Sequence, residues 1–254
     1  MVMGKVYLVG AGPGDPNLLT LRASQILGTA DVVIHDELVT EEILERVPAT
    51  AIKVCVAKGR HNCSQLRLVQ VNELMVSEAK KGKNVVRLQG GDPFIFGRGG
   101  EELEHLIANS VDFEIVPGVS SATAVPASVG IPLTNRRYSS SVAIVTGHED
   151  PSKDKPRVRW SQLASSVDTI VILMGASTFR KISRELLDSG MTRDTPIAVI
   201  EWGTTKRQKE KYTTLGEAAE DTSIDSLNPP CVIVVGKVAE FANVKIDSGK
   251  ESRG

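Results

Sequence analysis

The fold is decided by one stretch, Val85-Val86-Arg87-Leu88-Gln89-Gly90-Gly91-Asp92-Pro93-Phe94-Ile95-Phe96-Gly97-Arg98-Gly99-Gly100-Glu101-Glu102. Its first residues, 85–88, are mostly apolar and predict a buried strand. The glycine pair and proline that follow predict a turn with close backbone approach. Open α/β sheets bind ligands beyond the carboxyl ends of their strands, so this loop is a candidate ligand site. A purely structural turn is the competing interpretation.

Strands and helices alternate on both sides of this stretch, which predicts an α/β fold with mostly parallel sheets covered by helices. Residues 99–102 begin one such helix, with acidic residues in its first turn, where the helix dipole favours them. Other expected helices cover residues 21–28, 64–81, 122–129 and 178–188. Further strands are expected at 5–10, 30–35, 52–56, 113–116, 142–146, 169–173, 197–201 and 231–235. Residues 209–215 predict an edge or antiparallel strand.

The periodic pattern breaks over residues 130–140, which contain a proline and an unpatterned polar segment. Such a break is typical of a domain junction. We therefore expect an N-terminal α/β domain over residues 1–133 and a C-terminal α/β domain over residues 134–242. The remaining residues, 243–254, predict a polar, disordered tail.

Composition excludes several classes of protein. The chain has 254 residues and a net charge of −1, which argues against a general nucleic-acid binder. It contains neither a long apolar run nor a secretion signal, so we expect a cytoplasmic protein. Its three cysteines, Cys55, Cys63 and Cys231, lack metal-site spacing and are expected to be reduced thiols. The four histidines are scattered, so we expect no metal.

Residues 10–16 partly match a dinucleotide-binding fingerprint, and Asp36 follows at about the expected distance of 20 residues. The glycine spacing fails, however, because Asp15 occupies the position of the third glycine. Pro13 and Pro16 also stiffen a loop that should lead directly into a helix. A nicotinamide site is therefore disfavoured. The chain also lacks the lysine of a P-loop and the Gly-x-Ser-x-Gly elbow of serine hydrolases.

Several expected strands end in loops of glycine and other small residues. These loops cover residues 10–16, 90–93, 117–121, 174–175 and 202–204. Loops of this kind expose backbone amides and carbonyls, which suits a ligand with a nucleoside or amino-acid moiety.

Taken in order, these motifs resemble those of the tetrapyrrole methylases, over nearly the whole chain from Val6 to about Val238. Each motif alone is weak, but the ordered set is specific for the superfamily. The matching segments are residues 9–16, 36–39, 58–60, 87–93, 96–102, 116–118, 130–134, 146–148 and 173–175. Residues 36–39, 58–60 and 97–102 together indicate the branch that acts on uroporphyrinogen III.

The resemblance implies two α/β domains with the active site in the cleft between them, and usually a homodimer. It implies S-adenosyl-methionine as the methyl donor, and C2 and C7 of uroporphyrinogen III as acceptors. The products would be precorrin-2 and S-adenosyl-homocysteine. Whether the product then enters cobalamin or sirohaem synthesis stays open, as does the order of the two methylations.

The resemblance also implies roles for particular residues. Asp36 would be the proton acceptor and Lys58 the proton donor. A turn-capping role for Asp36 and a carboxylate-clamping role for Lys58 stay open. The implied donor site comprises Pro13, Gly90, Gly91, Asp92, Ile95, Ser120, Ser121, Met174 and Gly203. Because uroporphyrinogen carries many carboxylates, we expect cations at its site, and the candidates are Arg60, Arg98, Arg136 and Arg137.

Two residues depart from the family pattern: Asn135 replaces a histidine, and His35 replaces a tyrosine that commonly precedes Asp36. The Asn135 change bears on a junction or substrate contact and leaves the donor site unaffected. Three other functions stay open. They are a methylase acting on a later corrin precursor or on a protein side chain, a nicotinamide-dependent dehydrogenase, and a binding module without catalysis.

Overall fold

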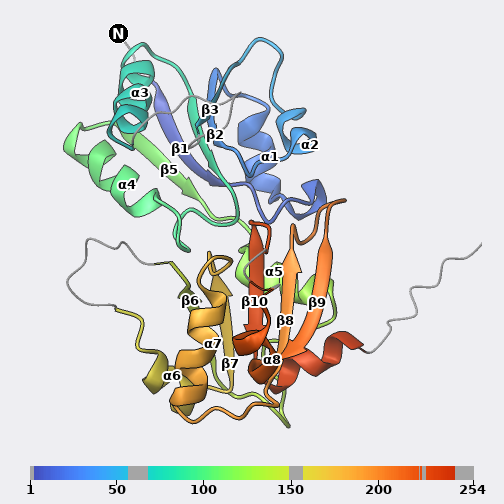
Figure 1. Ribbon diagram of the computed structural model, residues 1–254. Helices are drawn as coiled ribbons and strands as arrows, with labels where there is room; N and C mark the ends of the chain where they lie inside the picture. Colours follow the sequence, from blue (N-terminus) through green and yellow to red (C-terminus); the bar gives the residue numbers. More distant parts are fainter. Residues whose placement is uncertain (1–2, 57–67, 149–156, 223, 225–226, 244–254) are drawn as a thin grey trace, which may run out of the picture. The chain divides into compact units, whose positions relative to one another are not determined.

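The computed structural model describes residues 3–56, 68–148, 157–222, 224 and 227–243. The chain forms two compact units, Met1–Ser121 and Ala122–Gly254, each with its own sheet (Figure 1). The domain boundary expected after residue 133 stays a prediction. The expected polar tail lies almost entirely outside the described residues.

The sheet of the first unit is entirely parallel, as the sequence predicts. Its strand order is β3-β2-β4-β1-β5 (Figure 1). The strands are β1 (Lys5–Gly10), β2 (Val32–Asp36), β3 (Ile52–Val56), β4 (Val85–Gln89) and β5 (Asp112–Val116). Because all pairs are parallel, the carboxyl ends of all these strands meet at one edge of the sheet.

Helices cover both faces of this sheet. They are α1 (Leu21–Leu27), α2 (Glu41–Leu44), α3 (Leu68–Lys80) and α4 (Gly99–Ala108), with a short 3-10 turn, η1 (Pro16–Leu18), ahead of α1. Helix α1 begins as expected, because the Thr20 hydroxyl accepts a hydrogen bond from the Ala23 N–H at 3.1 Å. Ser64, the first residue of the helix expected over 64–81, lies outside the described residues.

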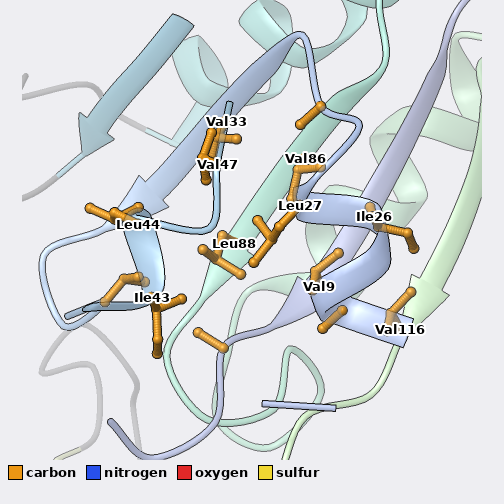
Figure 2. Close-up of a cluster of buried hydrophobic side chains, with 14 residues drawn as sticks. Val9, Ile26, Leu27, Val33, Ile43, Leu44, Val47, Val86, Leu88 and Val116 are labelled. Carbon is orange, nitrogen blue, oxygen red and sulfur yellow. The ribbon is translucent and has the colours of Figure 1, made fainter. Parts of the chain in front are cut away.

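The alternation of side chains along β1 divides the core of the first unit in two. Val9 packs with α1 and α2, whereas Leu8 packs on the opposite face with α3 and α4. Figure 2 shows the first cluster, where Ile26 and Leu27 of α1 lie against strand side chains. Burial on both faces explains why these strands are nearly continuous apolar runs.

The sheet of the second unit is mixed. Its order is β6-β7-β10-β8-β9, and only β6–β7 is a parallel pair among the described strands. The strands are β6 (Val142–Thr146), β7 (Thr169–Leu173), β8 (Pro196–Glu201), β9 (Lys209–Thr214) and β10 (Cys231–Val235). Residues 202–208 are too few for a crossover, so β9 must run antiparallel to β8. The expectation of mostly parallel sheets therefore holds for the first sheet but not for the second, where β8 and β9 are antiparallel to their neighbours. Strand β9 is the edge or antiparallel strand that residues 209–215 predicted.

Helices also cover both faces of the second sheet. They are α5 (Ser121–Ser128), α6 (Trp160–Ser166), α7 (Phe179–Asp188), α8 (Leu215–Glu220) and the 3-10 helix η3 (Lys237–Asn243). Phe179 and Leu186 of α7 are completely buried against one face. Val125 of α5 packs on the other face, with Val171 and Val232.

The expectation of three reduced cysteines is wrong for Cys55, which is disulfide-bonded. Sequence position alone does not reveal which cysteines come within bonding distance. Cys231 is free and buried, and burial raises the pKa of its thiol to about 12. No described helix has the length and apolar character needed to cross a bilayer. The described residues also contain no group of three or more His, Cys, Asp or Glu residues placed to hold a metal ion.

Candidate functional site

Three glycines bring the ends of β1, β4 and β5 into direct backbone contact. A Cβ atom added to Gly118 would lie 2.1 Å from the Gly91 carbonyl oxygen, and one added to Gly10 would lie 2.5 Å from the Gly118 Cα. Gly12 and Gly91 form an antiparallel bridge, with N···O distances of 3.1 and 2.7 Å. These contacts need residues without a side chain, so the glycines of the sequence motifs fix where the loops meet.

Asp92 braces two of these loops. Its Oδ2 accepts a hydrogen bond from the Gly118 N–H at 2.9 Å, and its Oδ1 accepts one from the Phe94 N–H at 2.8 Å. The carboxylate therefore joins the loop after β4 to the loop after β5. Its contribution to a ligand site is first of all to hold the shape of that site.

The donor-site residues predicted in the first unit gather at this edge. Pro13 lies half-buried between Gly12 and Gly14, whose φ angles are +75° and +134°. Gly91 has a φ of +69°, and a Cβ there would lie 3.7 Å from the backbone nitrogen of Ser121. The half-buried residues Gly90 and Ser120 adjoin these positions in the chain, and the exposed Ile95 lies farther along the β4 loop.

Met174 and Gly203 belong to the second unit, where they follow β7 and β8. Both strands run antiparallel to β10, which lies between them, so their carboxyl ends share one edge of the sheet. Met174 is half-exposed and has a φ of +55°. A Cβ on Gly203 would lie 2.3 Å from the Val125 side chain. The structure thus brings each predicted donor residue to the strand-end edge of its own sheet.

The turn around Gly203 is more constrained than the sequence reveals. Trp202 and Thr204 have φ angles of +51° and +65°, which L-residues rarely adopt. The Arg207 guanidinium lies 3.5 Å from the centroid of the Trp202 ring, a cation–π contact. Strained backbone of this kind is frequently found at functional sites. A sequence pattern could not indicate it, because neither residue is a glycine.

Asp36 is the last residue of β2 and lies at the same edge of the first sheet. Its Oδ1 accepts a hydrogen bond from Nη2 of Arg87, a β4 residue, at 2.6 Å. Arg87 in turn donates from Nε to Oε1 of Glu102, in α4, at 2.7 Å. Register explains the grouping. Arg87 pairs with Ile34 and so faces the same side as Asp36, the side that α4 covers.

Burial makes this ion-pair network unusual, since charged side chains are seldom fully buried. The Arg87 side chain is 5% exposed and that of Glu102 is 0% exposed. Burial alone would lower the pKa of Arg87, but the charges of Asp36 and Glu102 raise it above its ordinary value. Burial raises the pKa of Glu102, while Arg87 opposes that rise. Arg87 thus stays charged and compensates two carboxylates.

Gln89 connects this network to Arg98. The Gln89 side chain donates from Nε2 to Oε2 of Glu102 at 2.8 Å, and its Oε1 accepts from the Arg98 backbone N–H at 3.0 Å. Arg98 is the residue just before α4, and its side chain is exposed. The sequence placed Glu102 only in the first turn of a helix. Its pairing with Arg87 was not predicted. The available signal was Arg87 itself, a charged residue inside an apolar strand, which needs a buried partner of opposite charge.

The other predicted cationic residues are not part of this network. Lys58 and Arg60 lie outside the described residues. Arg136 and Arg137 are exposed in the second unit, and the Arg137 guanidinium lies 5.4 Å from the Tyr138 ring centroid. Asn135, which departs from the family pattern, accepts the Arg137 N–H on its Oδ1 at 2.9 Å and so shapes this turn.

His35, the other departure, lies directly before Asp36 and is buried. Its Nδ1 lies 3.0 Å from the Asp36 carbonyl oxygen. The ring therefore contacts the backbone of the proposed proton acceptor.

Comparison with known proteins assigns a family to this arrangement. Residues 5–219 match the family of Tetrapyrrole (Corrin/Porphyrin) Methylases. The chain is 46% identical to an S-adenosyl-L-methionine-dependent uroporphyrinogen III methyltransferase of Methanosarcina barkeri, over 95% of this chain and 94% of that protein. It is 45% identical to a uroporphyrinogen-III C-methyltransferase of Priestia megaterium, over 94% of this chain and 100% of that protein.

A solved structure shares both the fold and the sequence pattern. It is a uroporphyrin-III C-methyl transferase of Thermus thermophilus complexed with S-adenyl homocysteine. The TM-score is 0.77 and the identity is 36%, and the match covers 92% of this chain and 93% of that chain.

Proposed function

Because this chain belongs to the tetrapyrrole methylases, we propose that it transfers methyl groups from S-adenosyl-methionine to C2 and C7 of uroporphyrinogen III. The products are precorrin-2 and S-adenosyl-homocysteine. The observation that carries this proposal is the end-to-end similarity to methyltransferases of uroporphyrinogen III. The glycine-lined loop cluster at the edge of the first sheet supports it.

We propose that the donor binds the residues that the family resemblance implies. Pro13, Gly90, Gly91, Asp92, Ile95, Ser120 and Ser121 supply the first edge, and Met174 and Gly203 supply the second. Glycine loops let backbone groups approach a nucleoside or amino-acid moiety closely, which suits an adenosyl ligand. The convergence of Gly10, Gly91 and Gly118 and the Asp92 brace support this role for the first edge.

The reaction needs orientation more than activation. An electron-rich pyrrole carbon attacks the methyl carbon, a C–C bond forms, and the C–S bond breaks in line to release a neutral thioether. Holding the two carbons close and aligned supplies most of the acceleration. The cationic macrocycle then loses a proton, which the Asp36 carboxylate accepts. General base catalysis of this kind contributes about 10²–10⁴-fold.

The acceptor carries many carboxylates, while the whole chain has a net charge of −1. We therefore propose that local cations bind it, namely Lys58, Arg60, Arg98, Arg136 and Arg137. Arginine suits this role because its planar guanidinium binds carboxylates in a bidentate manner. Lys58 acts either as one of these clamps or as a proton donor, and Lys58→Arg separates the roles. A clamp tolerates the change, whereas a proton donor loses kcat because guanidinium does not deprotonate.

Two measurements test the proposed function. Incubation with uroporphyrinogen III and S-adenosyl-methionine should give a product heavier by two methyl groups. A different acceptor, or no methylated product, would contradict the assignment. Thermal unfolding provides the second test, because S-adenosyl-homocysteine should raise Tm while a nicotinamide cofactor leaves it unchanged. The opposite pattern would favour the dehydrogenase interpretation.

We further propose that the protein acts as a cytoplasmic homodimer that does not bind nucleic acid. The family resemblance supports the dimer, and the net charge of −1 supports the lack of nucleic-acid binding. Light scattering on the purified protein tests the dimer, and a mass equal to one chain would contradict it. Fractionation of cells tests the cytoplasmic location. The disulfide bond of Cys55 does not support that location, because disulfides are rare in cytosolic proteins.

A further inference from the structure

We infer that Glu102 and Gln89 are positioning residues for Asp36, acting through Arg87. This inference rests on the proposed function, in which Asp36 accepts the proton. Neither residue reaches the site edge itself: Glu102 is 0% exposed and Gln89 is 2% exposed. They act by fixing the guanidinium that holds the exposed end of the network, the Asp36 carboxylate.

Glu102 fixes the plane of the guanidinium. Its Oε1 accepts from Arg87 Nε at 2.7 Å, and its Oε2 accepts from Gln89 Nε2 at 2.8 Å. A carboxylate held at both oxygens cannot rotate, so Arg87 Nε has one orientation available. Without Gln89, Glu102 would be free to turn about its terminal torsion, which is otherwise broad.

The remaining nitrogens of Arg87 are also engaged. Nη1 lies 3.4 Å from the Ile34 carbonyl and 3.3 Å from the Leu88 carbonyl, while Nη2 donates to Asp36 Oδ1 at 2.6 Å. Exposure rises along the network, from 0% for the Glu102 side chain through 5% for Arg87 to 29% for Asp36. The network therefore runs from the interior under α4 to the edge where the loops after β1, β4 and β5 meet.

Stability alone gives a weak reason for this arrangement. Buried ion pairs lose much of their attraction to desolvation, and well-packed apolar residues of similar volume are often as stable. A buried glutamate, arginine and glutamine in a core of valine and leucine therefore point to a role in placing Asp36.

The same network also fixes Arg98 relative to Asp36. Gln89 Oε1 accepts the Arg98 N–H, and the adjoining loop has little freedom, because a Cβ on Gly97 would lie 2.3 Å from the Pro93 carbonyl oxygen. A cation for an acceptor carboxylate and the base for its proton are thus attached to one buried network, Arg98 through Gln89 and Asp36 through Arg87. Loss of the network should therefore misplace the acceptor relative to the base, with little effect on the donor.

The test is a double-mutant cycle between Glu102→Gln and Asp36→Asn, with kcat and both KM values measured. Glu102→Gln alone should lower kcat about tenfold or more, since a loosened base loses part of its roughly 10²–10⁴-fold contribution. KM for S-adenosyl-methionine should stay unchanged. In the Asp36→Asn background Glu102→Gln should cause little further loss, because both act through the same carboxylate. An equal loss of kcat in both backgrounds would overturn the inference.

Glu78→Gln is the matched control. Glu78 is another buried carboxylate, in α3 on the same face, paired with Lys81 and Lys83. It should leave kcat unchanged even if Tm falls. Gln89→Met provides a second variant that retains both charges, for use if Glu102→Gln does not fold; it too should lower kcat without changing KM for the donor. Unchanged kcat in Gln89→Met would overturn the inference. Absence of methyl transfer by the unmodified protein would instead refute the proposed function.

Discussion

The edges at the strand ends of the two sheets are built by partly different means. At the first edge, Gly10, Gly91 and Gly118 bring backbone segments into contact. The Asp36 carboxylate there is the most exposed member of a buried ion-pair network. At the second edge, Met174 and Trp202 adopt left-handed backbone angles, and Gly203 packs against the Val125 side chain. Glycine backbone contact shapes both edges, since a Cβ on Gly147 would lie 2.4 Å from the Gly175 Cα at the second. The first edge adds the charge of Asp36, whereas the second adds local strain and side-chain packing. Substitutions at the two edges should accordingly differ in what they damage.

The largest effect should come from the charge at the first edge. Asp36→Ala should lower kcat by about 10²–10⁴-fold, because it removes the proposed base. The Kd for S-adenosyl-homocysteine should change little, since the proposed donor contacts lie in the glycine-rich loops and do not include Asp36. Steady-state kinetics and calorimetry measure the two quantities, and parallel losses of rate and donor affinity would refute the catalytic role.

Gly118→Ala should be the most damaging glycine substitution at the two edges. Its Cβ would lie 2.1 Å from the Gly91 carbonyl oxygen, which is backbone and can move only with β4. We expect a loss of about 1–3 kcal/mol in the free energy of unfolding, typical of overpacking, together with loss of donor binding. Denaturant unfolding measures the first and calorimetry the second.

Gly100→Ala is the matched control, since an added Cβ there meets nothing within 4 Å. It should stabilise the protein by roughly 0.5–1 kcal/mol, because alanine is the better helix former. If both substitutions had equal effects, close backbone contact would not be what shapes the first edge.

Gly203→Ala should have a smaller effect than Gly118→Ala. The obstructing atoms belong to the Val125 side chain, 2.3 Å from the added Cβ, and a side chain can shift more readily than a strand. The companion substitution Val125→Ala should restore part of the lost donor affinity by making room. Failure of this rescue in a binding titration would argue against packing as the basis of the second edge.

The smallest effect should come from the exposed cation at the first edge. Arg98→Ala should raise KM for uroporphyrinogen III and leave kcat nearly unchanged, because the network holds Arg98 through its backbone N–H. Since the lost interaction is ionic, the KM of the unmodified protein should rise with salt more steeply than that of the variant. An unchanged KM would remove Arg98 from the acceptor site.

Sequence patterns predicted the first unit well because its features are local. Buried parallel strands are apolar runs, and a loop such as Gly90-Gly91-Asp92 can be recognised without knowing its neighbours. The antiparallel placement of β10 between β7 and β8 was not predictable, since it depends on how strands far apart in the sequence pair with one another. The Glu102–Arg87 pair and the strained Trp202 were also missed, because both depend on contacts between distant parts of the chain.

The central claim is that the strand-end residues proposed for the donor site bind an adenosyl donor. A crystal structure with S-adenosyl-homocysteine tests it most directly. We predict contacts from Pro13, Gly91 and Asp92 in the first unit and from Met174 and Gly203 in the second. A ligand bound elsewhere, or held by the loops of only one unit, would contradict the account.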